Sequence, residues 1–194
     1  TVTAANVEAE VGQDYTAPSV STTILSGDFT ADITIPILDG IIVEDTEDFT
    51  ITISSDVVTN DTGHDVNISA NDASVVTITD NDAAQLSIAD IAVNEGDGTA
   101  TLTVSTDFAV DEDVSITLTT ADNSALDGQD YTAETTVVTI AAGDLSATED
   151  IALLDGIIVE GIEVFDVAMS SETVANFDDH VVSILDGNAT ATIT

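Results

Sequence analysis

Hydrophobic and polar residues alternate with a period of two along much of this 194-residue chain. Residues 100–104 and 49–53 each place apolar side chains at every second position, with threonines between them. Because successive side chains of a β-strand point to opposite faces, this pattern predicts strands with one buried face. Residues 33–37 follow the same rule and predict a further strand. Since no segment keeps a helical period over three turns, we expect an all-β chain of short strands, as in an antiparallel β-sandwich.

The chain also contains an internal repeat. The block Gly12–Ala17 recurs as Gly128–Ala133, and Leu38–Glu44 recurs as Leu154–Glu160, so the offsets are 128 − 12 = 116 and 154 − 38 = 116. Aligning residues 1–55 with residues 117–171 gives 27 identical pairs out of 55. Agreement at a fixed spacing indicates two copies of one structural module.

The two copies differ in length within this sequence. Residues 83–194 are predicted to form a nearly complete module, and residues 1–82 a partial one. The first copy lacks a counterpart of residues 84–116, which is 116 − 84 + 1 = 33 residues. We therefore expect the first sandwich to lack its first two strands at the N-terminus.

Charge narrows the functions that the chain can perform. It has 38 Asp and Glu, no Lys or Arg and two His, for a formal net charge of -38. Without cations to face phosphates, binding to nucleic acid or to an anionic membrane surface is not expected. No apolar run approaches the roughly 18 residues of a membrane span, so membrane insertion is not expected either. A hydrophobic content of 43% favours a folded core over an acidic disordered tail.

Three blocks of the sequence carry a family resemblance. They are the turn Val93–Gly96, the Gly128-Gln129-Asp130-Tyr131 block, and the acidic stretch Leu154–Glu163; the first copy adds a closing Thr77–Asp82. In this order they resemble the Calx-beta domain. The resemblance implies tandem immunoglobulin-like antiparallel β-sandwiches, the first incomplete at its N-terminus, with Ca²⁺ held by loops at one end of each sandwich.

The resemblance also implies which residues hold the ion. In the second copy these are the side chains of Glu95, Asp130, Asp155 and Glu160 and the carbonyl of Ile158. In the first copy they are Asp14, Asp39, Glu44, Asp80 and Asp82 and the carbonyl of Ile42. Ca²⁺ takes six to eight oxygen ligands, and clustered carboxylates without counter-charges supply them. The alternative is that these Asp and Gly residues only form turns.

Calcium-sensing family members carry a run of acids where this chain has one Asp followed by Gly40 or Gly156. The departure implies fewer ions or weaker binding than in a sensor. His64 and His180 fall at matching positions of the two copies, where we expect exposed loops.

No motif of a catalytic site is present, so we expect no enzyme. The sequence favours a non-catalytic structural or adhesive repeat of a long extracellular surface protein or fibre, stiffened by calcium at module ends. The expected partners are neighbouring copies of the same module or subunit, with a cell-surface or matrix ligand as a further expectation. The alternative is a subunit of a self-assembling extracellular filament, in which a neighbour's strands complete the first sandwich.

Overall fold

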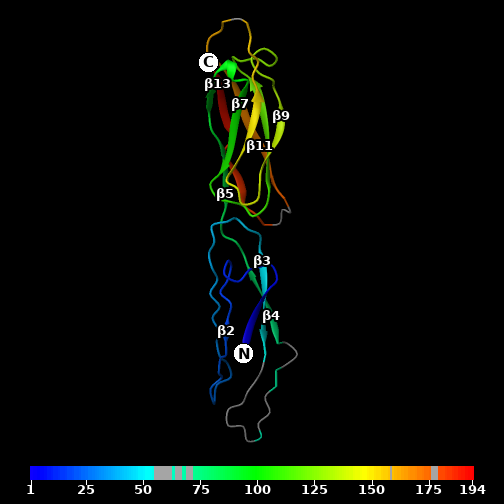
Figure 1. Ribbon diagram of the computed structural model, residues 1–194. Helices are drawn as coiled ribbons and strands as arrows, with labels where there is room; N and C mark the ends of the chain where they lie inside the picture. Colours follow the sequence, from blue (N-terminus) through cyan, green and yellow to red (C-terminus); the bar gives the residue numbers. More distant parts are fainter. Residues whose placement is uncertain (55–62, 64–66, 69–71, 158, 176–178) are drawn as a thin grey trace. The chain divides into compact units, whose positions relative to one another are not determined.

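The computed structural model describes the chain except residues 55–62, 64–66, 69–71, 158 and 176–178 (Figure 1). The described residues divide into two compact units. The first comprises Thr1–Gly40 and Asp45–Asp80, and the second comprises Ile41–Glu44 and Asn81–Thr194.

The second unit is a two-layer sandwich of short strands. Its elements are β5 (Ala84–Ile88), β6 (Ile91–Val93), the 3₁₀ turn η1 (Glu95–Asp97), β7 (Thr99–Thr106), β8 (Val114–Asp122), β9 (Thr135–Ile140), β10 (Ser146–Ala152), β11 (Glu163–Val174), β12 (Val182–Asp186) and β13 (Asn188–Ile193). One sheet has the order β10-β7-β5-β12, and the other has the order β6-β13-β11-β8-β9.

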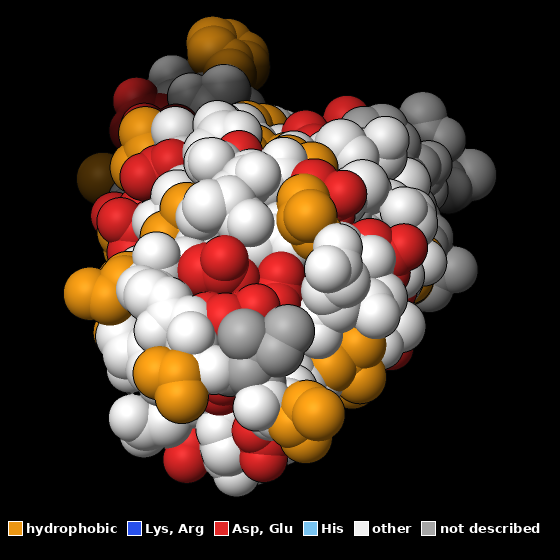
Figure 2. Space-filling view, turned by 90° about the horizontal axis from the view of Figure 1, so that it is seen from above, with side chains coloured by type: hydrophobic (Ala, Val, Ile, Leu, Met, Phe, Trp, Pro, Cys, Tyr) orange, Lys and Arg blue, Asp and Glu red, His pale blue; other side chains and the backbone are white. Residues whose placement is uncertain are grey.

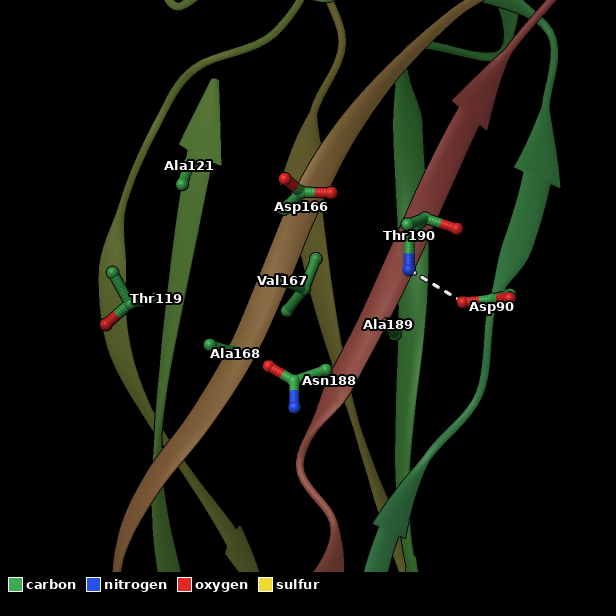
Figure 3. A pocket seen from close by; sticks show the side chains of 9 residues that line it. All are labelled: Asp90, Thr119, Ala121, Asp166, Val167, Ala168, Asn188, Ala189 and Thr190. Atoms are coloured by element: carbon green, nitrogen blue, oxygen red, sulfur yellow. Dashed lines mark hydrogen bonds between the residues drawn. The ribbon is translucent and has the colours of Figure 1, made fainter. Parts of the chain in front are cut away.

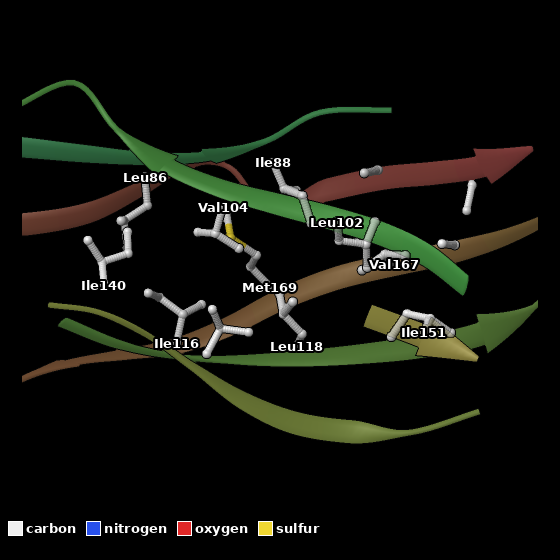
Figure 4. Packing of buried hydrophobic residues seen from close by; sticks show 14 of the residues in the cluster. Leu86, Ile88, Leu102, Val104, Ile116, Leu118, Ile140, Ile151, Val167 and Met169 are labelled. Carbon is white, nitrogen blue, oxygen red and sulfur yellow. The ribbon is translucent and has the colours of Figure 1, made fainter. Parts of the chain in front are cut away.

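Alternation along the strands builds the core between these two sheets. In β7, Ala100, Leu102 and Val104 are buried, while Thr101 and Thr103 are exposed. Figure 4 shows Leu102 and Val104 meeting side chains of β8 and β11 between the layers, with Met169 among them. The period-two pattern of the sequence therefore selects the inner face of each strand, which confirms the predicted sandwich.

Two strand pairs depart from the predicted antiparallel arrangement. β12 runs parallel to β5, and β13 runs parallel to β6, whereas the other named pairs are antiparallel. A residue from far upstream also enters this unit. Val43 is fully buried in its core, and its N–H donates to the carbonyl of Ala109 at 2.9 Å.

The first unit is built around a single described sheet. Its strands are β1 (Val2–Asn6), β2 (Ser19–Val20), β3 (Glu47–Ile53) and β4 (Ala73–Ile78), in the order β2-β1-β3-β4. Its buried hydrophobic cluster contains Ala9, Tyr15 and Phe49, with partly buried side chains packed against it. Among the described residues, this cluster is much smaller than the hydrophobic core of the second unit.

The strand predicted over residues 33–37 is wrong. This segment forms no named strand and contributes one isolated bridge, between Ile37 and Tyr15. With the repeat offset of 116, residues 30–36 correspond to β10, which pairs with β7 in the second unit. Among the described residues, no strand pairs with this segment.

His180 corrects a second prediction. It lies between β11 and β12, but its side chain is buried, at 4% exposed, and its Nε2 lies 2.5 Å from Oδ1 of the exposed Asp111, so the side chain is not exposed as predicted. His64 lies outside the described residues.

Within the part of the chain that the structure describes, no helix is long and apolar enough to cross a membrane.

Candidate metal centre

The turn between β8 and β9 holds a buried carboxylate. It is formed by the repeated Gly-Gln-Asp-Tyr block, in which Gly128 has a φ of 76° and donates its N–H to the carbonyl of Tyr131 at 2.9 Å. Asp130 is 8% exposed, and its Oδ2 accepts the N–H of Leu126 at 2.7 Å. Its backbone carbonyl accepts the N–H of Leu154 at 3.0 Å. These bonds fix Asp130 between the turn and the chain that follows β10.

An aromatic pair ties this turn to β11. The rings of Tyr131 and Phe165 stack with their centroids 4.3 Å apart and their planes 9° from parallel. Burial raises the pKa of Tyr131 to about 12, and its hydrogen bond to Asp122, at 2.8 Å, adds to the shift. Because Phe165 lies two residues after the start of β11, the stack brings Asp130 beside the first residue of that strand, Glu163.

Three acidic side chains converge at this end of the second unit. Carboxylate oxygens of Asp130, Glu160 and Glu163 all lie within 4.8 Å of one another. They line a hollow of about 40 Å³ together with Glu95, Gly161, Ile193 and Thr194. Figure 2 looks onto an end of the molecule, and acidic side chains gather at the centre of that face.

The electrostatics of the cluster are unfavourable without a cation. Burial raises the pKa of the Glu163 carboxyl, and the neighbouring Asp130 carboxylate raises it further, as do Glu160 and Glu95. In most proteins a Lys or Arg side chain relieves such a group, but this sequence contains neither residue. A proton or a bound cation must therefore relieve the negative charge at this position.

The donor set fits a hard divalent ion. Ca²⁺ binds carboxylate oxygens at about 2.3–2.6 Å, so two oxygens that share one ion are at most about 5 Å apart. The separations within 4.8 Å among Asp130, Glu160 and Glu163 meet this limit. All three residues offer oxygen, the ligand atom that Ca²⁺ and Mg²⁺ prefer over softer metals. The residues present could hold such an ion, with water and backbone carbonyls completing its coordination.

Only some of the predicted ligands of the second copy lie at the three-acid cluster. Asp130 and Glu160 belong to the three-acid cluster, and Glu95 lines the same hollow while its Oε1 accepts the N–H of Gly156 at 2.8 Å. Asp155 is exposed and is not among the residues that line this hollow. Ile158 lies outside the described residues.

Glu163 belongs to the cluster but is not among the ligands predicted from the sequence. A signal for it exists in the repeat. The spacing Glu160-x-x-Glu163 recurs as Glu44-x-x-Glu47, so both copies keep the second acid at the start of a strand.

The first copy repeats the local geometry around its own aspartate. Asp14 Oδ2 accepts the N–H of Glu10 at 2.6 Å, and its carbonyl accepts the N–H of Leu38 at 2.8 Å. These donors correspond to Leu126 and Leu154 at the offset of 116. The rings of Tyr15 and Phe49 stack as well, with their centroids 4.0 Å apart.

The other predicted ligands of the first copy fall in different parts of the chain. Asp39 and Asp80 belong to the first unit, whereas Ile42, Glu44 and Asp82 belong to the second. Asp39 and Ile42 are exposed, and the three remaining acids are half-buried.

A larger hollow lies on the outer face of the five-stranded sheet (Figure 3). It measures about 380 Å³ and is lined mainly by small side chains of β8, β11 and β13, with Asp90 and Asp166 as its acids. Asp90 Oδ1 accepts the N–H of Thr190 at 2.7 Å, as the dashed line in Figure 3 shows. Its two acids form no three-acid cluster among the described residues, so the candidate metal centre is the smaller hollow.

The fold and the acidic end define a tandem of all-β modules. The family model for the Calx-beta domain matches residues 1–82 and again residues 78–194. The chain therefore belongs to the Calx-beta domain family. No curated protein shows a significant match to it.

Solved structures agree with this assignment of the fold. The chain is similar to CBD12 from CALX1.2, with a TM-score of 0.54 at 16% identity, covering 100% of this chain and 86% of that one. It is also similar to the Calx CBD2 domain, with a TM-score of 0.52 at 13% identity, covering 56% of this chain and 85% of that one. At these identities the similarity supports the β-sandwich fold alone.

Proposed function

We propose that the chain is a non-catalytic structural or adhesive repeat of a long extracellular surface protein or fibre, stiffened by Ca²⁺ at module ends. The observation that carries this proposal is the convergence of Asp130, Glu160 and Glu163 within 4.8 Å in a chain without Lys or Arg. Membership of the Calx-beta domain family supports it.

A bound ion would join the turn that holds Asp130 to the start of β11 and the loop before it, 30 residues and more further along the chain. Asp130 lies in the turn before β9, Glu160 in the loop before β11, and Glu163 at the first position of β11. A cation shared by the three would hold the loop and the turn against the strand. Since an ion that binds only the folded state stabilises it by mass action, calcium would stiffen this end of the module.

An extracellular location is part of the proposal. Extracellular calcium modules bind at about 10⁻⁴–10⁻³ M, which suits a site with three clustered carboxylates and no longer run of acids. The net charge of -38 also favours a surrounding rich in screening and bridging cations. Neighbouring modules and a cell-surface or matrix ligand are the proposed partners.

The test is thermal unfolding of the intact chain, followed by circular dichroism in EDTA, in 10 mM CaCl₂ and in 10 mM MgCl₂. Calcium should raise the melting temperature well above the EDTA value, and magnesium should raise it less because Mg²⁺ gives up its water reluctantly. Equal midpoints in EDTA and calcium would contradict the proposal.

A second candidate function is a subunit of a self-assembling filament, in which a neighbour's strands complete the first sandwich. The first unit favours it, because its buried hydrophobic cluster is small and large apolar side chains are exposed, among them Leu25 at 66% and Phe29 at 95%. Strand addition would cover such a surface. Intact mass spectrometry of the native protein separates the two candidates: a chain that continues upstream of Thr1 favours the modular rod, and a free Thr1 favours the filament.

A further inference from the structure

The open edge of the five-stranded sheet lacks charge. This edge is β9, whose sequence Thr-Thr-Val-Val-Thr-Ile contains no acid, although charged residues make up 20% of the chain. The opposite edge strand, β6, has three residues. In the other sheet, the edge strand β10 carries Glu149 and Asp150, and β12 ends on Asp186. Short or charged edges discourage pairing with another chain, and β9 has neither protection.

The ladder between β8 and β9 shows which backbone groups of β9 face outwards. The N–H of Thr120 donates to the carbonyl of Glu134 at 3.0 Å, just before the strand begins. Residues that bond to the neighbouring strand alternate in an antiparallel ladder, so residues 136, 138 and 140 face β8. Thr135, Val137 and Thr139 therefore direct their N–H and carbonyl groups to the open edge.

The side chains of these three residues are also accessible. Thr135, Val137 and Thr139 are exposed, with Val137 at 61%, while Val138 and Ile140 are buried in the core. The strand combines an anchored inner face with an uncharged, β-branched outer face. Such a strand is well suited to accept another strand.

We propose that β9 pairs antiparallel with β9 of a second copy of this chain and so joins two five-stranded sheets across the edge. A two-fold axis through Val137 sets Val137 opposite Val137 and Thr135 opposite Thr139. This register engages all three outward-facing residues of each strand. Within it, Glu134 lies opposite Ile140, so no carboxylate of the paired segments faces another carboxylate.

Charge favours a second copy over a foreign partner. A cationic protein attracted to a surface of net charge -38 would need carboxylates at its contact, and β9 has none to offer. The strand is instead complementary to itself. Repulsion between two highly acidic chains opposes the pairing at low ionic strength, so the association should strengthen as salt screens it. The proposal does not depend on the metal centre, which lies on other residues.

The test is sedimentation velocity of the full chain over a concentration series, at 20 mM and at 500 mM NaCl in EDTA. A dimer should form at the higher salt. Val137→Glu should weaken it at least tenfold, because the register sets two introduced carboxylates face to face. Val181→Glu is the matched control, since Val181 is 55% exposed, directly precedes β12 of the other sheet, and gives the same change in charge. Its dimer should match that of the unsubstituted chain.

The register has a test of its own. The chain contains no cysteine, so Val137→Cys introduces a unique thiol. A short thiol-reactive cross-linker should join two Val137→Cys chains at high salt, and Val181→Cys chains should remain uncoupled. A chain that stays monomeric at both salt concentrations would overturn the proposal. So would self-association that survives Val137→Glu while circular dichroism shows this variant folded.

Discussion

The substitution Glu163→Gln should change the stability of the protein in opposite directions without and with calcium. In the ion-free protein, Glu163 is half-buried beside Asp130 and Glu160, and burial together with the Asp130 carboxylate raises its pKa. Glu163→Gln keeps the shape of the side chain and removes its charge. The variant should therefore be more stable than the unsubstituted protein in EDTA and less stable in calcium.

The size of the effect follows from the geometry of the cluster. Two unit charges 4.8 Å apart repel by about 3.5 kcal/mol at an effective dielectric constant of 20, and by about 0.9 kcal/mol in bulk water. Glu163 takes part in two such pairs, and Glu160 is exposed, which screens one of them. We expect the ion-free variant to gain about 1–3 kcal/mol. Calcium at 100 times its Kd stabilises the unsubstituted protein by about 2.7 kcal/mol, and the variant should lose most of this gain.

Thermal and urea unfolding in EDTA and in 10 mM CaCl₂ measure both effects. Glu149→Gln is the matched control, because Glu149 is a half-buried residue of β10 outside the cluster, and its variant should keep the full calcium response. A Glu163→Gln protein that is destabilised equally in both conditions would refute the reasoning.

Acidification provides a second measurement on the same pair of proteins. The folded-state pKa of Glu163 is raised, so the cost of its charge is absent below its unfolded pKa and appears as the pH rises through the folded pKa. In EDTA, the advantage of Glu163→Gln should therefore shrink as the pH falls. If the stability difference between the two proteins does not change with pH, it does not come from the ionisation of Glu163.

Three further predictions concern the aromatic stack beside the site and the buried histidine of the second unit. Phe165→Ala removes the ring stacked on Tyr131 and should cost about 3–5 kcal/mol in urea unfolding; a cost below about 1 kcal/mol would show that the stack does not hold the turn. The Tyr131 pKa of about 12 lies above its ordinary value of 10, so the folded state keeps a proton that the unfolded chain loses. Stability should therefore fall between pH 10 and 12 by up to about 1.4 kcal/mol per unit, and Tyr131→Phe should remove part of the slope if this tyrosine causes it. His180→Asn should cost about 1–3 kcal/mol at pH 7, because the buried His180 side chain loses its hydrogen bond to the exposed Asp111, and an unchanged denaturation midpoint would contradict this.

The sandwich and the core of the site were predictable from local signals. Alternation identifies the buried face of β7, and the repeated Gly-x-Asp-Tyr block identifies Asp130. The Glu160-x-x-Glu163 spacing was visible as well, but only the fold shows that the second acid turns towards Asp130. An alternating pattern alone does not make a strand, because a strand also needs a neighbouring strand to pair with, and residues 33–37 form no named strand.

Other features depend on contacts that no local pattern encodes. Val43 and Val159 occupy the same position of two identical Ile-Ile-Val-Glu segments, yet Val43 is fully buried and Val159 is 99% exposed. The difference comes from Val110 and its neighbours, which surround Val43 in the core of the second unit. His180 is a similar case, since its hydrogen-bond partner, Asp111, lies 69 positions earlier in the chain.

The two stacked tyrosines give each module its own optical reporter. The chain has no Trp, and its only tyrosines are Tyr15 and Tyr131, each directly following the aspartate of its Gly-Gln-Asp-Tyr block. Fluorescence excited near 280 nm therefore arises from these two rings, each packed on a phenylalanine. In a Tyr15→Phe chain, the remaining emission would report the second module alone, so calcium binding could be followed one module at a time without attaching a dye.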